Sequence, residues 1–199
     1  MGQESIYGDQ FPELEKIRIR IQTKIDELRS SMKKTYGLDP VEHCLSRIKA
    51  EDSMREKCRR KGLPETTESA LQKIHDAIGF RIVCTFLDDI YVIRDYLKEI
   101  EGVEVIEEKD YIRHVKPNGY RSYHMILLVD GRHYVEIQLR TISMDTWAAL
   151  EHHLKYKKKI RGNEDLIVAE LKRCANTLAS TDISMQAIKQ MIFDEGEEE

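Results

Sequence analysis

The chain has 199 residues, of which 41% are apolar, and this is enough for one domain with a single hydrophobic core. No run of 18 apolar residues and no apolar leader are present, so we expect a soluble cytoplasmic protein without a membrane span. The net charge is −4, but five acids lie in the tail 194–199, and the remainder has 32 basic against 31 acidic residues, a net charge of +1. Such a balance argues against a general duplex-binding protein, and the tail is expected to be solvated.

The cysteines are spread along the chain. Cys44, Cys58, Cys84 and Cys174 form no C-x-x-C pair of the kind that zinc sites use. We therefore expect reduced thiols in the core, which suits the cytoplasm.

Apolar residues in the N-terminal segment recur at steps of three and four. This spacing predicts an amphipathic helix over 12–35 that ends near Gly37 and Pro40. The apolar face needs a partner, either within the domain or on another subunit. Its members are Leu14, Ile17, Ile21, Ile25, Leu28 and Met32.

The segment 41–75 is predicted to be mainly helical. A short helix is expected from Val41, followed by an extended stretch at 47–49. A second helix, capped by Asp52 or Ser53, should run through Lys61, and a third should run from 66 or 67 to about 75.

The second of these helices carries a polar stripe. Ser53, Lys57 and Arg60 stand at i, i+4 and i+7 and therefore share one face. Ordinary solvation is the alternative explanation, because nearby acids can neutralise the two cations.

Strands are expected on both sides of a helix over 89–100. Residues 78–86 are rich in β-branched and aromatic side chains and predict an internal strand, with Asp76 just before it and Arg81 within it. Residues 103–107 predict another strand. An aspartate at a helix-strand junction is usually a cap, but a second carboxylate nearby would make it a metal ligand.

The segment 116–141 predicts a β-hairpin preceded by a tight turn. Pro117-Asn118-Gly119 is a turn signal, and the runs 122–129 and 133–141 flank Asp130-Gly131. In the second run the polar residues Glu136, Gln138 and Arg140 alternate with apolar ones. The chain thus predicts an α/β (α+β) fold, with a mixed sheet of about five strands flanked by helices.

The register of this hairpin decides which side chains meet. A strict two-residue turn at Asp130-Gly131 would put His124 and Glu136 on opposite faces of the sheet. A three-residue loop or a bulge would bring them to the same face.

Two helices are expected after the hairpin. The first is capped by Thr141 or Ser143 and carries Trp147, and the second covers 163–193. The second has a heptad seam that needs a partner helix, either the N-terminal helix of the same chain or another subunit. The seam comprises Ile167, Leu171, Cys174, Leu178, Thr181, Met185, Ile188 and Ile192.

Several blocks together resemble the synthetase domain of RelA/SpoT-type alarmone synthetases. They are Lys-Pro-Asn-Gly-Tyr-Arg-Ser-Tyr-His at 116–124, Glu-Ile-Gln-Leu-Arg-Thr at 136–141, 147–157, Asp-Ala-Ile-Gly-Phe-Arg at 76–81 and the basic segment 47–60. The resemblance covers about 40–158, with the N-terminal helix and the segment 163–193 outside this catalytic core. Without further domains, the chain is most similar to the small alarmone synthetases, whose fold is nucleotidyltransferase-like.

The resemblance implies GTP pyrophosphokinase activity, in which pyrophosphate moves from ATP to the 3′-hydroxyl of GDP or GTP. It implies that Glu136 is a general base and that Asp76 and Glu136 hold Mg²⁺. It further implies that Tyr120 stacks on guanine. The ATP site would comprise Arg47, Lys49, Ser53, Lys57, Arg60 and Arg81. The acceptor site would comprise Lys109, Lys116, Tyr120, His124, Gln138 and Asp145.

The chain departs from the family pattern at some positions. Asp145 stands where the family carries an amide, which leaves its part in base recognition open. Comparable members form homotetramers with a central cleft for a regulatory nucleotide, but His43 and Leu45 differ from their residues there. Two alternatives also remain, a nucleotide-sensing or single-stranded RNA-binding module, and transfer to an adenine nucleotide or RNA acceptor.

Overall fold

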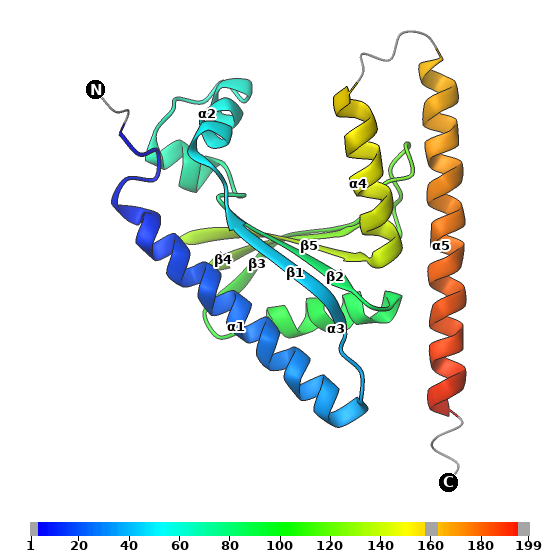
Figure 1. Ribbon diagram of the computed structural model, residues 1–199. Coiled ribbons are helices and arrows are strands. Elements are labelled where there is room, and N and C mark those ends of the chain that lie inside the picture. Colours follow the sequence, from blue (N-terminus) through cyan, green and yellow to red (C-terminus); the bar gives the residue numbers. More distant parts are fainter. Residues whose placement is uncertain (1–3, 158–162, 195–199) are drawn as a thin grey trace.

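The computed structural model describes residues 4–157 and 163–194, and its centre is one mixed sheet (Figure 1). The sheet has the strand order β1-β2-β5-β4-β3, in which β2 and β5 are parallel and all other neighbours are antiparallel. This confirms the predicted five-stranded mixed sheet. The strands are β1 (Val41–Ile48), β2 (Ile78–Cys84), β3 (Val103–Asp110), β4 (Tyr123–Val129) and β5 (His133–Thr141).

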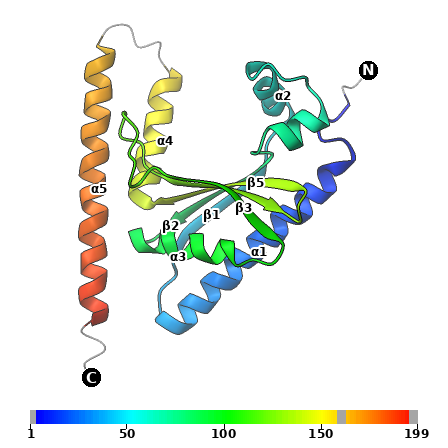
Figure 2. The same cartoon turned by 180° about the vertical axis from the view of Figure 1, so that it is seen from behind.

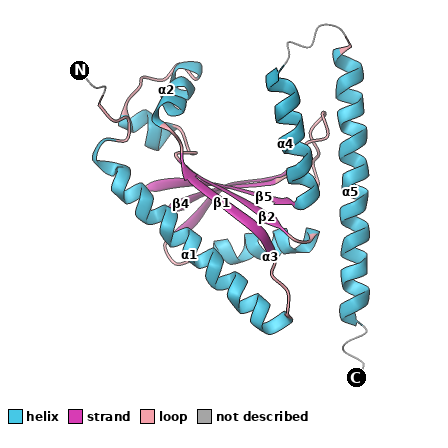
Figure 3. Ribbon diagram, in the orientation of Figure 1, coloured by secondary structure: helices cyan, strands magenta, loops and turns pink. Residues whose placement is uncertain are grey.

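The helices lie on both sides of this sheet. Figures 1 and 2 show α1 (Phe11–Tyr36) and α3 (Leu87–Lys98) along one face. On the other side, α2 (Glu51–Arg60) and α4 (Ile142–Lys157) stand at opposite ends of the sheet, and α5 (Glu164–Asp194) runs beside α4 (Figure 3). The short helices η1 (Gly8–Gln10) and η2 (Ser69–Lys73) complete the described part.

The hydrophobic core lies between the sheet and the layer of α1 and α3. Ile21 and Ile25 of α1 are fully buried there, as are Val135, Ile137 and Leu139 of β5. The apolar stripe of α1 therefore packs against its own domain, which is one of the two partners predicted for it; the other was a second subunit. Because α1 covers the sheet, it does not cover the seam of α5.

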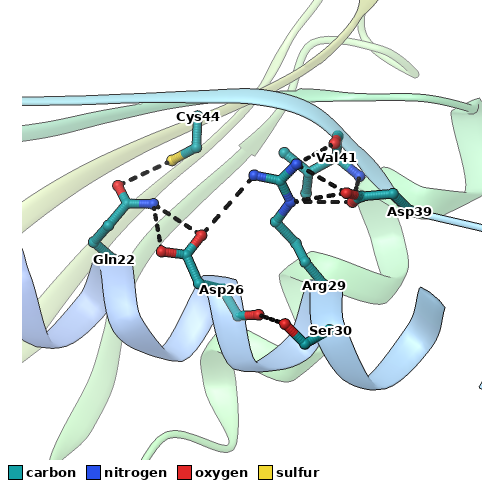
Figure 4. Close-up of polar contacts among 7 residues, drawn as sticks. All are labelled: Gln22, Asp26, Arg29, Ser30, Asp39, Val41 and Cys44. Carbon is teal, nitrogen blue, oxygen red and sulfur yellow. Dashed lines mark hydrogen bonds and ion pairs between the residues drawn. The ribbon is translucent and has the colours of Figure 1, made fainter. Parts of the chain in front are cut away.

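The second half of α1 is fastened to the start of β1 by polar contacts (Figure 4). Arg29 pairs with Asp39 at 2.9 Å and donates to the Val41 carbonyl oxygen at 3.1 Å. Burial alone would raise the pKa of Asp39, but the hydrogen bonds from Arg29 and the Val41 amide and the nearby positive charges together outweigh burial and lower the pKa. The Cys44 thiol donates to Gln22, and burial raises its pKa to about 11.

The helix predicted from Val41 is wrong, because residues 41–48 form the edge strand β1. Its ladder with β2 runs from Val41 opposite Cys84 to Ile48 opposite Ile78. Pairing with a segment at least 30 residues further along the chain overrides the local pattern.

Two other helices have ends that differ from the predicted ones. The second helix begins at Glu51 and has no side-chain cap, so neither Asp52 nor Ser53 plays that part. The helix predicted to end near His75 is short, and its π-helical part covers only Ser69–Lys73.

The hairpin between β4 and β5 has a three-residue loop, the alternative that was predicted to bring His124 and Glu136 to the same face of the sheet. Val129 pairs with His133, and the loop takes positive φ at Asp130 (52°) and Gly131 (64°). His124 consequently lies opposite Gln138, on the face that also carries Glu136.

Helix α5 is docked through α4 and the end of the sheet. The Trp147 indole donates to the Leu171 carbonyl oxygen at 2.8 Å, and Thr141 donates to Asp182 at 2.6 Å. Lys189 pairs with Asp88 at 2.9 Å. The predicted seam is thus covered only in part. Ile167, Leu171 and Leu178 are half-buried, whereas Met185, Ile188 and Ile192 are exposed.

The prediction of core thiols holds for three cysteines. Cys58 and Cys84 are buried and Cys44 is half-buried, but Cys174 is exposed on the outer side of α5. Within residues 4–157 and 163–194, no helix combines the length and apolarity that crossing a bilayer requires. The acidic tail from 195 onward lies outside the described residues.

Candidate active site

The site is built on the sheet face that α1 and α3 leave uncovered. Strand register aligns its polar side chains in two adjacent rows across the sheet. In one row, Lys109, His124, Gln138, Arg81 and Leu45 are successive partners on the five strands. In the next row, Glu136 lies opposite Gly79 and Gly79 lies opposite Arg47.

Asp76 precedes β2 at one end of this face and is held by two lysines. Its Oδ2 lies 3.0 Å from Lys49 Nζ and 2.5 Å from Lys57 Nζ. Burial would raise the pKa of Asp76, but the hydrogen bonds and charges of the two lysines outweigh burial and lower it. Asp76 Oδ1 is buried and has no hydrogen-bond partner among the described residues, so this carboxylate oxygen is available to a ligand.

A cleft on the same face of the sheet carries two of the predicted ATP-binding arginines. Its volume is about 160 Å³, and Arg47 of β1 and Arg81 of β2 line it together with Glu136 and Gln138 of β5. Ser53 and Arg60 lie exposed on α2, with Lys57 half-buried on the same helix. The absence of a side chain at Gly79 leaves the space between Arg47 and Glu136 open, since a Cβ there would meet nothing within 4 Å.

A second cleft adjoins the first across Glu136. It has a volume of about 110 Å³, and its lining includes Lys109 of β3, His124 of β4 and the loop residue Lys116. Lys109 pairs with Glu107 at 2.6 Å. Glu136 lines both clefts, so one carboxylate faces two cation-lined spaces.

Two aromatic rings lie beside Lys116 of the second cleft. Lys116 Nζ lies 4.2 Å from the ring centre of Tyr111 and 4.9 Å from that of Tyr120. Tyr111 is a lining residue that the sequence interpretation missed, although it directly follows the Glu-Lys-Asp block. The Tyr120 ring also contacts Trp147 edge-on, with centroids 6.4 Å apart.

His124 is neutral at physiological pH. Burial, followed by the positive charges of Arg140, Lys116 and Lys109, lowers its pKa to about 4. Its Nε2 lies 2.9 Å from the Tyr120 hydroxyl oxygen. A neutral imidazole can accept the proton of that hydroxyl, whereas a protonated one cannot.

Asp145, on the first turn of α4, forms ion pairs with two arginines. Its Oδ1 lies 3.0 Å from Arg140 Nη1 and 3.7 Å from Arg81 Nε. A third cleft, of about 480 Å³, opens beside these residues and is lined by Arg47, Arg81, Tyr120 and Arg140 together with residues of α4. Arg47 and Arg81 are shared with the first cleft, so the clefts form one continuous region.

The described residues contain no cluster of three or more metal-binding side chains. Two carboxylates, Asp76 and Glu136, stand at the cation-lined face instead. Mg²⁺ commonly takes one or two protein carboxylates and completes its octahedron with substrate phosphates and water. The pair therefore fits an ion that arrives with a polyphosphate.

Comparisons with known proteins identify the family. Residues 46–161 match the family model described as a region found in RelA / SpoT proteins. This chain belongs to the RelA/SpoT family. It is 39% identical over 182 residues to the GTP pyrophosphokinase YwaC of Bacillus subtilis, covering 86% of this chain and 85% of that protein. It is 33% identical over 177 residues to YjbM of the same organism, covering 85% and 82%.

Solved structures agree with this RelA/SpoT assignment. The small alarmone synthetase 1 of Bacillus subtilis, bound to its product pppGpp, superposes with a TM-score of 0.78 at 30% identity and covers 92% of this chain and 95% of its own. The small alarmone synthetase 2 of that organism gives 0.74 at 36% identity, covering 89% and 96%. The homologues are thus GTP pyrophosphokinases and small alarmone synthetases, which are diphosphotransferase enzymes. The chain shares their fold, including the long N- and C-terminal helices.

Proposed function

We propose that this protein transfers pyrophosphate from ATP to the 3′-hydroxyl of GDP or GTP, releasing AMP and forming the alarmone (p)ppGpp. In this reaction the 3′-oxygen bonds to the β-phosphorus of ATP as the bond from that phosphorus to the α,β-bridging oxygen breaks. The observation that carries the proposal is the position of Glu136, which lines both adjoining clefts. A base located there reaches an acceptor hydroxyl on one side and a donor phosphate on the other.

The donor cleft would hold the ATP triphosphate. Arg47, Arg81, Lys49 and Lys57 supply cations from β1, β2 and α2, and Ser53 and Arg60 extend the same helix face. Charge-assisted hydrogen bonds contribute about 1.5 to 3 kcal/mol each, so a few of them would fix the phosphates for in-line attack. Lys49 and Lys57 both pair with Asp76, which leaves one positive charge uncompensated for a bound phosphate.

We assign Mg²⁺ to Asp76 and Glu136. The partnerless, buried Oδ1 of Asp76 supports this assignment, because a buried carboxylate oxygen without a donor is costly unless a cation approaches it. When bound, the ion would offset the negative charge of the transferring phosphates. The two carboxylates also keep their places without it, since each is hydrogen-bonded by neighbouring side chains.

The acceptor cleft would hold the guanine nucleotide. Lys109 and Lys116 of this cleft offer charges for the acceptor phosphates, and His124 would lie beside the ribose. At its edge, Tyr120 offers a ring for stacking 4.9 Å from Lys116 Nζ, and Gln138 lies opposite His124 on β5. Glu136 would take the 3′-hydroxyl proton as the new bond forms. Asp145 is engaged by Arg140, so its contact with the base would have to compete with that ion pair.

The decisive experiment is incubation with ATP labelled at its γ-phosphate, Mg²⁺ and, in separate reactions, GDP, GTP, GMP, ATP or tRNA. We expect labelled (p)ppGpp and unlabelled AMP with GDP and GTP, only when Mg²⁺ is present. A labelled adenine nucleotide that carries an added 3′-pyrophosphate, or label on tRNA, would instead establish the different acceptor. Binding of guanine nucleotides or RNA without any transfer would establish the sensing module.

We further infer a homo-oligomer, a tetramer whose four chains associate through their C-terminal helices α5.

 The apolar side chains that remain exposed on α5, among them Met185, Ile188 and Ile192, support this assembly. A central cleft between the subunits would then be available to a regulatory nucleotide. We assign the protein to the cytoplasm, where its nucleotide substrates are found.

A further inference from the structure

Arg140 is a buried arginine of the motif block 136–141 to which no substrate role has been assigned. Its side chain lies on the same face of β5 as Glu136 and Gln138, and only 5% of the residue is exposed. Burying a guanidinium is costly unless charges and hydrogen bonds compensate it. Its Nη1 lies 3.0 Å from Asp145 Oδ1, and this ion pair supplies the compensating charge.

One branch of contacts runs from Arg140 to the catalytic carboxylate. Arg140 Nη2 donates to Gln138 Oε1 at 3.0 Å, and Gln138 Nε2 donates to Glu136 Oε2 at 3.3 Å. Because arginine can only donate, it holds the oxygen of the Gln138 amide on its own side. The amide nitrogen is thereby turned toward Glu136.

A second branch runs from Arg140 to the acceptor cleft. The same Nη2 donates to the Tyr120 hydroxyl oxygen at 2.8 Å, and that hydroxyl lies 2.9 Å from His124 Nε2. The hydroxyl accepts from Arg140, so its own proton is free to be donated to the neutral imidazole. The guanidinium carbon also lies 5.4 Å from the centre of the Tyr120 ring.

The shape of the guanidinium makes this arrangement specific to arginine. Its planar fork carries donors in fixed directions, and here it reaches an acceptor on each of Asp145, Gln138 and Tyr120. A lysine would keep the charge, but its single nitrogen cannot reproduce the fork.

We propose that Arg140 is a positioning residue for pyrophosphate transfer, orienting Glu136 through Gln138 and the Tyr120 ring through its hydroxyl. The proposal deepens the proposed function and rests on it. The proposal predicts two separate kinetic effects. The Gln138 branch ends at the general base and should affect kcat, whereas the Tyr120 branch ends in the acceptor cleft and should affect GDP binding.

The test is a double-mutant cycle with Arg140→Lys, Tyr120→Phe and the double variant. We measure kcat and the KM values for GDP and ATP, together with the Kd for GDP in the absence of ATP. Tyr120→Phe should raise the GDP KM and Kd about tenfold, the equivalent of one hydrogen bond to a charged group. Arg140→Lys should do the same and also lower kcat about tenfold, with the ATP KM unchanged.

The double variant decides whether Arg140 acts through Tyr120. If it does, the double variant should bind GDP no more weakly than Arg140→Lys, within about twofold, because the second change removes a contact already lost. Multiplied effects of about a hundredfold would overturn the Tyr120 branch. An unchanged kcat in Arg140→Lys would overturn the Gln138 branch.

Two controls distinguish positioning from mere stability. Arg132→Lys, at an exposed arginine of the same hairpin, should leave all constants unchanged. If Arg140→Lys does not fold, Arg140→Gln and the kinetics of Tyr120→Phe alone take its place, and wild-type GDP binding by Tyr120→Phe would overturn the proposal. A melting temperature that falls while the constants of the folded enzyme stay wild-type would also overturn it. Wild-type turnover in the same assays tests the proposed function separately.

Discussion

Asp76 and Glu136 reach the same face from different elements, and their surroundings differ. Asp76 is held by Lys49 and Lys57, whereas Glu136 accepts a hydrogen bond from the neutral amide of Gln138. The first environment, one carboxylate between two ammonium groups, has a net charge of +1 and suits the binding of phosphates that arrive with a cation. The second leaves a carboxylate that can accept a proton.

We expect Asp76→Asn and Glu136→Gln each to abolish transfer while the protein stays folded, because each change preserves size and removes a negative charge. Turnover with GDP is the measurement, and Glu104→Gln, at an exposed glutamate of β3, is the control. Residual turnover above about a tenth of wild type, a loss below about 1.4 kcal/mol, would contradict the assignment of that carboxylate.

The low pKa of His124 predicts a pH-dependent stability. Unfolding returns the imidazole to its ordinary pKa, so between about pH 6.5 and 4 the unfolded chain binds a proton that the folded chain does not. Stability should therefore fall as pH falls through this window, by about 3 kcal/mol when fully developed.

The measurement is the urea midpoint of wild type and of His124→Asn from pH 7 to pH 4. The variant should lose less stability than wild type over this range. Burial also lowers the pKa of His133, but that contribution is common to both proteins and cancels in the difference. Parallel curves for the two proteins would show that His124 does not carry the effect.

At the scale of elements, α5 supports the loop that carries Lys116 and Tyr120. Gly119, in that loop, has a φ of +93°, and a Cβ there would lie 2.7 Å from Ala175 Cβ and 3.0 Å from Lys172 Cα on α5. Arg121, also in the loop, donates to Asn176 of α5 at 3.0 Å. The helix and the acceptor loop are therefore in direct contact.

Gly119→Ala should push the loop and α5 apart and raise the GDP KM, leaving the ATP KM unchanged. Gly37→Ala is the matched control, because Gly37 also has positive φ (+72°) but a Cβ there would meet nothing within 4 Å. Gly37→Ala should cost about 1 kcal/mol of stability through backbone strain, and Gly119→Ala should cost more because of its added contact with α5. Only Gly119→Ala should change acceptor kinetics. Equal kinetic effects would refute the coupling.

At the scale of the whole molecule, the apolar faces of the two long helices α1 and α5 differ in how far the domain covers them. Helix α1 buries its stripe under the sheet, whereas the last turns of α5 present Ile188 (47% exposed) and Ile192 (64% exposed) to solvent. An exposed apolar strip of this kind is typical of an interface between subunits.

Light scattering should give a mass of about four times the 23.3 kDa of one chain. Ile188→Glu should lower this mass by placing a charge on the strip, and Gln190→Glu, at an exposed polar position of the same helix, should not. A mass near 23 kDa for the wild-type protein would refute the assembly and leave the catalytic proposal standing.

Local patterns in the sequence were sufficient for much of this fold. The steps of three and four in α1, the glycine at its end and the alternation in β5 predicted these elements, because side-chain periodicity and turn chemistry are properties of neighbouring residues. The motif blocks likewise predicted Glu136 and the cations that line the two clefts.

The tertiary structure decided what depends on distant partners. Residues 41–48 became a strand only because β2 offers them a hydrogen-bond ladder, and the three-residue hairpin loop brought His124 and Glu136 to one face. Arg140 resembled any polar residue of an exposed face until the fold surrounded it with Asp145, Gln138 and Tyr120. Periodicity shows which face a side chain occupies, but only the packing of separate elements determines what that side chain meets there.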